Sequence, residues 1–326
     1  MEEPVPERMR AAATALLTAL DEPARRRARH DFDDEPARRW LEYRPRPRPG
    51  VTLADLDVPA RKAAHRLLAT ALSPAAYAQA MAVVALEEVL DRAEGWRRGR
   101  HSGDYGVAVF GDPAHDDRWA WRFEGHHLSV SMTVADDRVS PAPVFLGANP
   151  ATVRHAGRPV SRPLGPEEDL ARELLDALGP GGRAAAVIAD EAPADIISAT
   201  RPTAPGRLDP LGVPRGRLGP TGRALLDRLV ALYLDRLPTE LAAREATRIH
   251  GGELHFAWAG PVEPGRRHYY RVQGDDLLIE YDNTTDDGNH AHTALRRPAG
   301  DFGADVLAAH HAAAHRPGPV SGDAPR

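Results

Sequence analysis

Two histidines in the last third of the chain have the spacing of a metal-binding pair. His290 and His292 lie in the stretch AsnHisAlaHisThr. Alternate residues of a β-strand point to the same side, so a strand here would present both imidazoles together. Two imidazoles presented in this way can bind one metal ion. We therefore expect His290 and His292 to be ligands of a divalent metal.

Carboxylates that could complete this site come directly before the two histidines. Glu280 and Asp282 alternate in the stretch LeuLeuIleGluTyrAsp, so both would lie on one face of a strand. With Glu280 as an oxygen ligand, His290 and His292 would form a set of two histidines and one carboxylate, with positions open for water and substrate. Asp282 is a second candidate for a catalytic carboxylate.

A third histidine begins another stretch with alternating pattern, at residues 127–134. His127 would share one face of this strand with Ser129, Ser131 and Thr133, while apolar residues take the other face. If the two strands lie near each other, His127 can serve as a further metal ligand or as a general base.

The same stretch permits a simpler interpretation. Residues 282–289 are AspAsnThrThrAspAspGlyAsn, and Asp, Asn and Gly are typical of hydrophilic turns. The histidines would then bond only to neighbouring backbone groups. The sequence has no glycine-rich phosphate loop, no nucleophile elbow and no His-Glu-x-x-His motif, which removes the commonest patterns of kinases, esterases and zinc proteases.

Two arginines stand at matching places in two similar stretches. Residues 118–128 (ArgTrpAlaTrpArgPheGluGlyHisHisLeu) align without a gap with residues 267–277 (ArgHisTyrTyrArgValGlnGlyAspAspLeu). Arg122 and Arg271 correspond, and both could hold an anionic substrate by bidentate contacts. Pairing with acids such as Glu124 explains them equally well.

The alignment and the hydrophobic patterns together predict an α+β fold. We expect two related antiparallel β-meanders packed about a pseudo-twofold axis, flanked by helices, with a helical N-terminal region. Ser73 followed by Pro74 predicts the start of a long helix that ends before Gly95. The expected organisation is a helical lead (1–30), one domain (31–315) with repeat halves at 104–190 and 222–315, and a disordered tail (316–326).

Composition narrows the class of protein. The chain has 326 residues, of which 42% are hydrophobic, enough for a large core. It has no cysteine, so any metal must be held by nitrogen and oxygen ligands. The formal net charge of −5 disfavours a nucleic-acid partner, and no apolar run is long enough to span a membrane. The acidic start does not look like a signal peptide, so we expect a cytoplasmic protein.

Several of these segments, in the same order, resemble an uncharacterised family, the domain of unknown function 3500 (DUF3500). They are GluGlyHisHisLeuSer (124–129), PheLeuGlyAlaAsnProAla (145–151), HisPheAlaTrpAlaGly (255–260), and LeuLeuIleGluTyrAspAsnThr with AsnHisAlaHisThr. The likeness extends over almost the whole chain and includes the histidine-bearing segments. It implies little about activity, because the family is defined by sequence.

We expect a metal-dependent enzyme that acts on a small organic substrate. A Zn²⁺ ion would favour hydrolysis, whereas Fe²⁺ or Cu²⁺ on the same ligands would suit an oxidoreductase. The other alternative is a non-catalytic protein that binds a small anion. The sequence does not indicate the oligomeric state.

Overall fold

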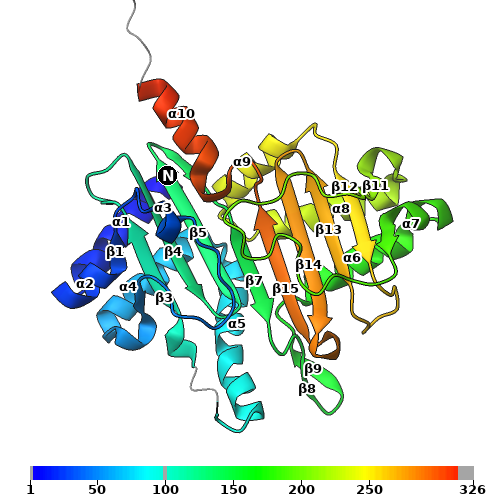
Figure 1. Cartoon of the computed structure of the whole chain (residues 1–326), viewed down its shortest axis with the longest axis horizontal. Helices are drawn as coiled ribbons and strands as arrows, with labels where there is room; N and C mark the ends of the chain where they lie inside the picture. Colours follow the sequence, from blue (N-terminus) through cyan, green and yellow to red (C-terminus); the bar gives the residue numbers. More distant parts are fainter. Residues whose placement is uncertain (1–2, 98–100, 315–326) are drawn as a thin grey trace, which may run out of the picture.

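The computed structural model describes residues 3–97 and 101–314, and its centre is one large, mostly antiparallel sheet (Figure 1). Ten of its strands form the order β1-β3-β4-β5-β7-β15-β14-β13-β12-β10, and β2, β6 and β11 pair with β3, β5 and β12. β8 (Val153–His155) and β9 (Arg158–Ser161) form a separate hairpin. The strands of the large sheet are β1 (Arg29–His30), β2 (Val51–Thr52), β3 (Gly106–Phe110), β4 (Arg118–Gly125), β5 (Leu128–Ala135), β6 (Arg138–Ser140), β7 (Val144–Ala148), β10 (Val187–Ala189), β11 (Val213–Pro214), β12 (His255–Ala259), β13 (Tyr269–Gly274), β14 (Leu277–Thr285) and β15 (His290–Arg296).

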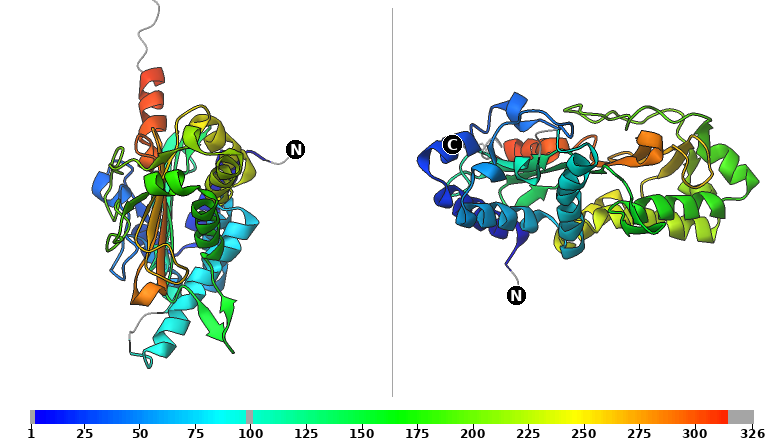
Figure 2. Two further views of the ribbon diagram at one scale, coloured as in Figure 1. Left: turned by 90° about the vertical axis from the view of Figure 1, so that its right-hand side faces the viewer. Right: turned by 90° about the horizontal axis from the view of Figure 1, so that it is seen from below.

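Helices cover one face of this sheet, and long connectors cover the other (Figure 2). The connectors run from residue 31 to 50 and from 190 to 212, and α10 lies on their side of the sheet. The helices are α1 (Val5–Ala19), α2 (Glu22–Ala28), α3 (Glu35–Arg38), α4 (Val58–Ala71), α5 (Pro74–Ala93), α6 (Gly165–Ala177), α7 (Pro180–Ala186), α8 (Pro220–Leu234), α9 (Thr239–Ile249) and α10 (Ala304–Ala314). The α+β fold expected from the sequence is confirmed.

The helix expected after Ser73 is present as α5. The Ser73 hydroxyl accepts a hydrogen bond from the backbone N–H of Ala76, and Pro74 occupies the first turn, where its missing N–H costs nothing. The alanine-rich run then continues to Ala93. Two acids of α5 are buried, Glu87 and Asp91, and Glu87 contacts His126 at the end of the sheet.

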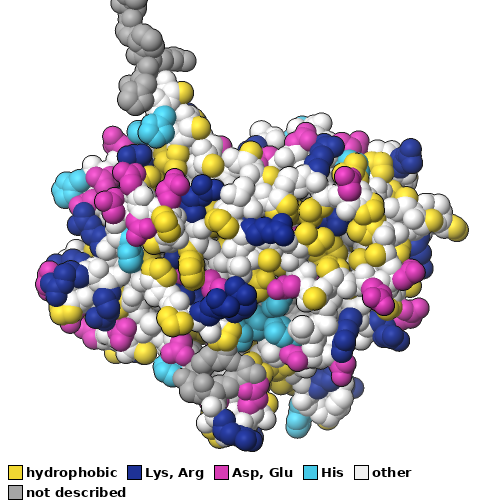
Figure 3. All heavy atoms as spheres, in the orientation of Figure 1, with side chains coloured by type: hydrophobic (Ala, Val, Ile, Leu, Met, Phe, Trp, Pro, Cys, Tyr) yellow, Lys and Arg dark blue, Asp and Glu magenta, His cyan; other side chains and the backbone are white. Residues whose placement is uncertain are grey.

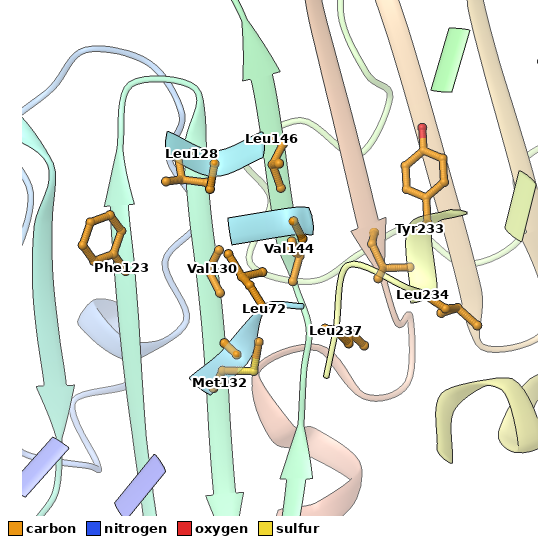
Figure 4. Close-up of a cluster of buried hydrophobic side chains, with 14 of the residues drawn as sticks. Leu72, Phe123, Leu128, Val130, Met132, Val144, Leu146, Tyr233, Leu234 and Leu237 are labelled. Carbon is orange, nitrogen blue, oxygen red and sulfur yellow. The ribbon is translucent and has the colours of Figure 1, made fainter. Parts of the chain in front are cut away.

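The main core lies between the sheet and the helices. Alternate residues of β5, namely Leu128, Val130 and Met132, point toward the helix layer, where they meet side chains such as Leu72 (Figure 4). All of them are at most 4% exposed. Burial of each such side chain stabilises the fold by roughly 1.5–3 kcal/mol. This packing holds the central strands, and with them the site, in a fixed position.

The opposite face of the central strands is polar and is nevertheless buried. Ser129, Ser131 and Thr133 of β5 share this face, as their alternation predicts, and are at most 5% exposed. The connectors and α10 shield the polar face from solvent. Polar side chains near the centre of the sheet therefore lie in a sheltered environment, where hydrogen bonds and charges act strongly.

The order of elements occurs twice along the chain. When the short elements α3, β6, β8 and β9 are left out, the series α1-α2-β1-β2-α4-α5-β3-β4-β5-β7 is followed by α6-α7-β10-β11-α8-α9-β12-β13-β14-β15 in the same order. β1 pairs in parallel with β3, and β10 pairs in parallel with β12. β3 and β12 occupy the same place in the two series. The repeated series includes the helices before each meander, which the alignment of 118–128 with 267–277 did not reach. A pseudo-twofold axis between the meanders stays a prediction.

The N-terminal helix packs into the same core as the rest of the chain. Val5, Met9, Ala13 and Leu16 of α1 are fully buried, and α1 lies against α4. The division of the chain into domains stays a prediction, and the tail expected at 316–326 lies outside the described residues. No helix in the described part is long and apolar enough to cross a membrane.

Candidate metal centre

Three histidines from the two halves of the chain meet at the middle of the sheet. His127 lies in the turn between β4 and β5, whereas His290 and His292 lie on β15. β7 separates β5 from β15, so the histidines meet across this strand. Figure 3 shows histidine side chains gathered below the centre of this face, where β7 ends and β15 begins in Figure 1.

The two histidines of β15 are placed by the strand itself, as the sequence predicted. His292 lies opposite Asp282 of β14 on one side and opposite Gly147 of β7 on the other. His290 pairs with Thr285 just beyond an irregularity in the same ladder. Because every second residue of a strand faces the same side, both imidazoles project to one side of β15, where His292 meets Asp195 of the connector 190–212.

His127 reaches this point from a turn rather than from a strand. Its φ angle of 63° is left-handed, which is uncommon for a residue other than glycine. The turn is held by two backbone hydrogen bonds: the His127 N–H donates to the Tyr43 carbonyl at 3.0 Å, and the His127 carbonyl accepts from the Gly147 N–H at 2.7 Å. Backbone conformations of this kind are concentrated at functional sites.

Gly147 makes room for the imidazole of His127. A Cβ atom at this position would lie 2.8 Å from Cδ2 of His127 and 3.1 Å from the Ala291 carbonyl oxygen. Real Cβ atoms are essentially never found at the shorter distance, so any side chain here would displace the ring. A glycine inside a strand is a recognised sign of such a close approach.

The three imidazoles offer their nitrogens to one point. Nε2 of His127 and Nε2 of His290 are 2.8 Å apart, and one nitrogen from each of the three rings lies within 4.8 Å of the others. The His127 ring centroid is 5.3 Å from that of His292. Nitrogens that share a metal ion are on the order of 3–4 Å apart, because each metal–nitrogen bond is about 2 Å long. The cluster therefore has the dimensions of a metal site.

The second nitrogen of each β15 histidine is held by a carboxylate. Nδ1 of His290 is 3.0 Å from Oδ2 of Asp286 and 3.2 Å from the Asn149 amide nitrogen. Nδ1 of His292 is 2.9 Å from Oδ1 of Asp195 and 3.2 Å from Oδ2 of Asp282. This arrangement fixes the ring orientation and leaves Nε2 as the ligand atom, as in most protein sites where histidine binds a metal.

The surroundings shift the pKa values of the two β15 histidines in opposite directions. Burial lowers the pKa of His290 to about 4, and the neighbouring His292 adds to this effect. Burial opposes the charge of His292 as well, but the carboxylates of Asp282 and Asp195 outweigh it and raise the pKa of His292 to about 9. The Tyr43 hydroxyl donates to Asp195 at 2.7 Å, which keeps that carboxylate in place.

Glu280, which we expected as an oxygen ligand, lies outside this cluster. Its fully buried carboxylate accepts hydrogen bonds from the backbone N–H groups of Ile197 and Ser198 and from the Tyr269 hydroxyl. No metal-compatible group among the described residues contains Glu280. Of the two β14 carboxylates, Asp282 is the one that reaches His292, because it lies directly opposite His292 in the ladder.

Arg122 and Arg271 hold the connectors rather than an open pocket. Arg122 donates to the carbonyl oxygens of Ala37, Arg38 and Trp40, and its Nε is 2.8 Å from Oε1 of Glu124. Arg271 makes the matching contacts in the second half, to the carbonyls of Leu208 and Pro210. Both side chains are 1% exposed, so the expectation that they bind substrate gains no support from their positions.

Sequence reasoning named Asp282 but missed the other partners of the imidazoles, Asp195, Asn149 and Asp286. Asp195 lies in the connector 190–212, about 100 residues from His292 along the chain, and no local motif marks it. Asn149 and Asp286 are turn-type residues that composition alone assigns to loops. Gly147, in the stretch PheLeuGlyAlaAsn, was the one signal available, because glycine inside a strand pattern indicates close contact.

Comparisons with known proteins agree with the likeness seen in the sequence. No curated protein matches the chain, and no solved structure matches it. The model of a family described as "Protein of unknown function (DUF3500)" matches residues 2–304, which is most of the chain and includes every histidine of the cluster. The chain therefore belongs to the DUF3500 family.

Proposed function

We propose that this protein is a metal-dependent enzyme that acts on a small organic substrate. His127, His290 and His292 bind the ion, and Asp282, Asp195 and Asp286 orient two of these imidazoles. The observation that carries the proposal is the convergence of three ring nitrogens within 4.8 Å, with carboxylates on the far nitrogens of His290 and His292. A hydrophilic turn would not require such an arrangement.

Three histidine ligands suit catalysis better than a structural role. A structural zinc ion is almost always bound by four protein ligands, whereas a catalytic zinc ion has three and leaves one position for water or substrate. Such an ion lowers the pKa of its bound water to about 7, which supplies hydroxide for hydrolysis. We therefore favour hydrolysis, with Asp282 as a group that orients His292.

An oxidoreductase is the alternative that the same ligands allow. Imidazole nitrogens bind iron and copper as well as zinc, so the identity of the metal decides between the two reactions. The other alternative was a protein that only binds a small anion. It depended on Arg122 and Arg271, which are 1% exposed and donate hydrogen bonds to backbone carbonyls of the connectors. We therefore do not extend it.

Elemental analysis by mass spectrometry tests the proposal. Protein purified without a histidine tag should contain a transition metal, and the double variant His290→Asn with His292→Asn should lose it. His310→Asn is a matched control, because His310 also pairs with a carboxylate, Asp136, at 2.9 Å and belongs to no metal-compatible group among the described residues. Equal metal in the double variant and the wild type would contradict the proposal. Ester, amide and phosphoester substrates, and oxygen consumption, then separate the two reaction classes.

A further inference from the structure

We propose that a second divalent transition-metal ion binds between Glu87 and His126, adjacent to the ion held by His127, His290 and His292. The proposal rests on the proposed function only in that the two positions share His127, which gives one ring nitrogen to each ion and releases its N–H proton to solvent when both ions are bound. The two new ligands are Glu87, a carboxylate from the helix layer, and His126, the neighbour of His127 in the sequence. The proposed function uses neither residue.

The side chains of this second position are already together. Nδ1 of His126 is in contact with Oε1 of Glu87, which α5 carries to the end of the sheet. The rings of His126 and His127 are stacked, with centroids 3.8 Å apart. One ligand atom from each of Glu87, His126 and His127 lies within 4.8 Å of the others. One carboxylate oxygen and two imidazole nitrogens are a usual donor set for Zn²⁺, Mn²⁺ or Fe²⁺.

The turn between β4 and β5 explains why neighbouring residues can serve two ions. His126 extends to Glu87 in the helix layer, whereas His127 extends to β15 on the side of the connectors. The Tyr105 hydroxyl donates to the His126 carbonyl, and a Cβ at Gly125 would overlap the Tyr105 ring. The turn is therefore tightly held, and both imidazoles are positioned before any ion arrives.

Burial gives Glu87 a reason to bind a cation. The residue is 5% exposed, and a buried carboxylate is costly unless a positive charge or several hydrogen bonds accompany it. Its described partner is an imidazole, whereas Glu124, in the same region, faces the guanidinium groups of Arg122 and Arg48. A divalent ion supplies the positive charge that Glu87 needs.

A cavity gives this position access to solvent and substrate. Its volume is about 310 Å³, and Glu87 and His126 lie in its wall beside the extended segment 45–50. Arg48 in that segment donates to the carbonyls of Glu42, Arg44 and Gly125, which holds the wall in place. A cavity of this size, at the lower end of the range of ligand pockets, can hold a small organic molecule next to Glu87 and His126.

Metal counting with Zn²⁺ tests the second position. The full chain is stripped with a chelator, reloaded with excess Zn²⁺, freed of unbound ion and analysed by mass spectrometry. We expect two zinc ions per chain in the wild type and in His310→Asn, but one in Glu87→Gln and in His126→Asn. Circular dichroism and thermal melting of each variant show that the fold is retained. His126 is partly exposed, so its variant serves as the second test if Glu87→Gln does not fold.

The possible results separate the two proposals. One zinc ion in the wild type, or two in both Glu87→Gln and His126→Asn, would overturn the second position and leave the proposed function intact. The wild type could also bind a single ion that is lost when any one of the four histidines is replaced. That result would mean one site with four histidine ligands and would overturn the second position. If the double variant of His290 and His292 keeps two ions, the proposed function fails instead.

Discussion

Asp282 lies directly opposite His292 in the β14–β15 ladder, and its Oδ2 is 3.2 Å from Nδ1 of that imidazole. Asp195 approaches the same nitrogen from the connector 190–212. His292 is therefore oriented by two carboxylates that come from separate parts of the chain. Glu280, on the same face of β14, faces Ala294 in the ladder and is engaged by backbone donors. These positions distinguish two carboxylates that contact the histidine cluster from one that is bound by backbone donors.

Replacement of Asp282 by asparagine should weaken metal binding. Loss of a carboxylate that orients a metal-binding histidine typically costs about 10- to 100-fold in affinity, because the imidazole is then less basic and less well oriented. Competition with a chromophoric chelator measures the Zn²⁺ affinity. An affinity within twofold of the wild type would show that Asp282 has no part in orienting His292.

Replacement of Glu280 by glutamine should leave the metal affinity unchanged and lower the stability. Burial raises the pKa of Glu280, and its carboxylate accepts from Ile197, Ser198 and Tyr269. The glutamine NH₂ group is a donor and cannot accept these hydrogen bonds, so some of the N–H groups would lose their acceptor. We expect the free energy of unfolding to fall by about 1–3 kcal/mol. Urea denaturation measures this change. If Glu280→Gln instead lost metal as Asp282→Asn does, Glu280 would be a ligand after all.

Gly147→Ala should disturb the metal site with little effect on the rest of the fold. The new methyl group would lie 2.8 Å from His127, so the imidazole must move away from His290. We expect Zn²⁺ affinity to fall at least tenfold. Gly181→Ala is the control, because a Cβ there meets nothing within 4 Å. Equal affinities in the two variants would mean that the position of the His127 ring does not matter.

Arg271→Met should loosen the connector 190–212. The variant removes the hydrogen bonds from the charged guanidinium to the carbonyls of Leu208 and Pro210, at a cost of roughly 1–3 kcal/mol in unfolding free energy, although Gln273 still donates to Leu208. Limited proteolysis should then cut within this connector sooner than in the wild type. Arg228→Met, at a side chain 64% exposed, should change neither measurement. An unaltered cleavage rate in Arg271→Met would show that the arginine does not hold the connector.

His268 should make the protein less stable in mild acid. Burial, reinforced by the neighbouring Arg172, lowers the pKa of His268 from 6.5 to about 4. The unfolded chain therefore takes up this proton first as the pH falls. Stability is full above pH 6.5 and decreases from there to about pH 4, by about 3 kcal/mol in total.

The variant His268→Phe isolates this contribution. Phenylalanine keeps the ring stacked between Trp258 and Tyr281 but cannot bind a proton. Urea denaturation at several pH values should show a smaller loss of stability between pH 6.5 and pH 4 in the variant than in the wild type. Parallel losses in the two proteins would show that His268 does not titrate in this range.

Local patterns were sufficient to predict the elements that carry the site. The alternation in 127–134 and 277–282 predicted strands, and β5 and β14 lie at these places, because side chains of a strand alternate whatever the strand packs against. The spacing of His290 and His292 likewise placed both imidazoles on one side of a strand. The family likeness also followed from sequence motifs alone, and the match to residues 2–304 confirms it.

Only the tertiary structure decides which residues far apart in the chain contact each other. The sequence by itself determined that His127, His290 and His292 were candidates, but their meeting depends on β7 lying between β5 and β15. The choice of Asp282 over Glu280 depends on the register of one ladder, where a shift of two residues exchanges the carboxylates opposite His292. Strand order and register are set by packing between distant segments, and no short stretch of sequence contains that information.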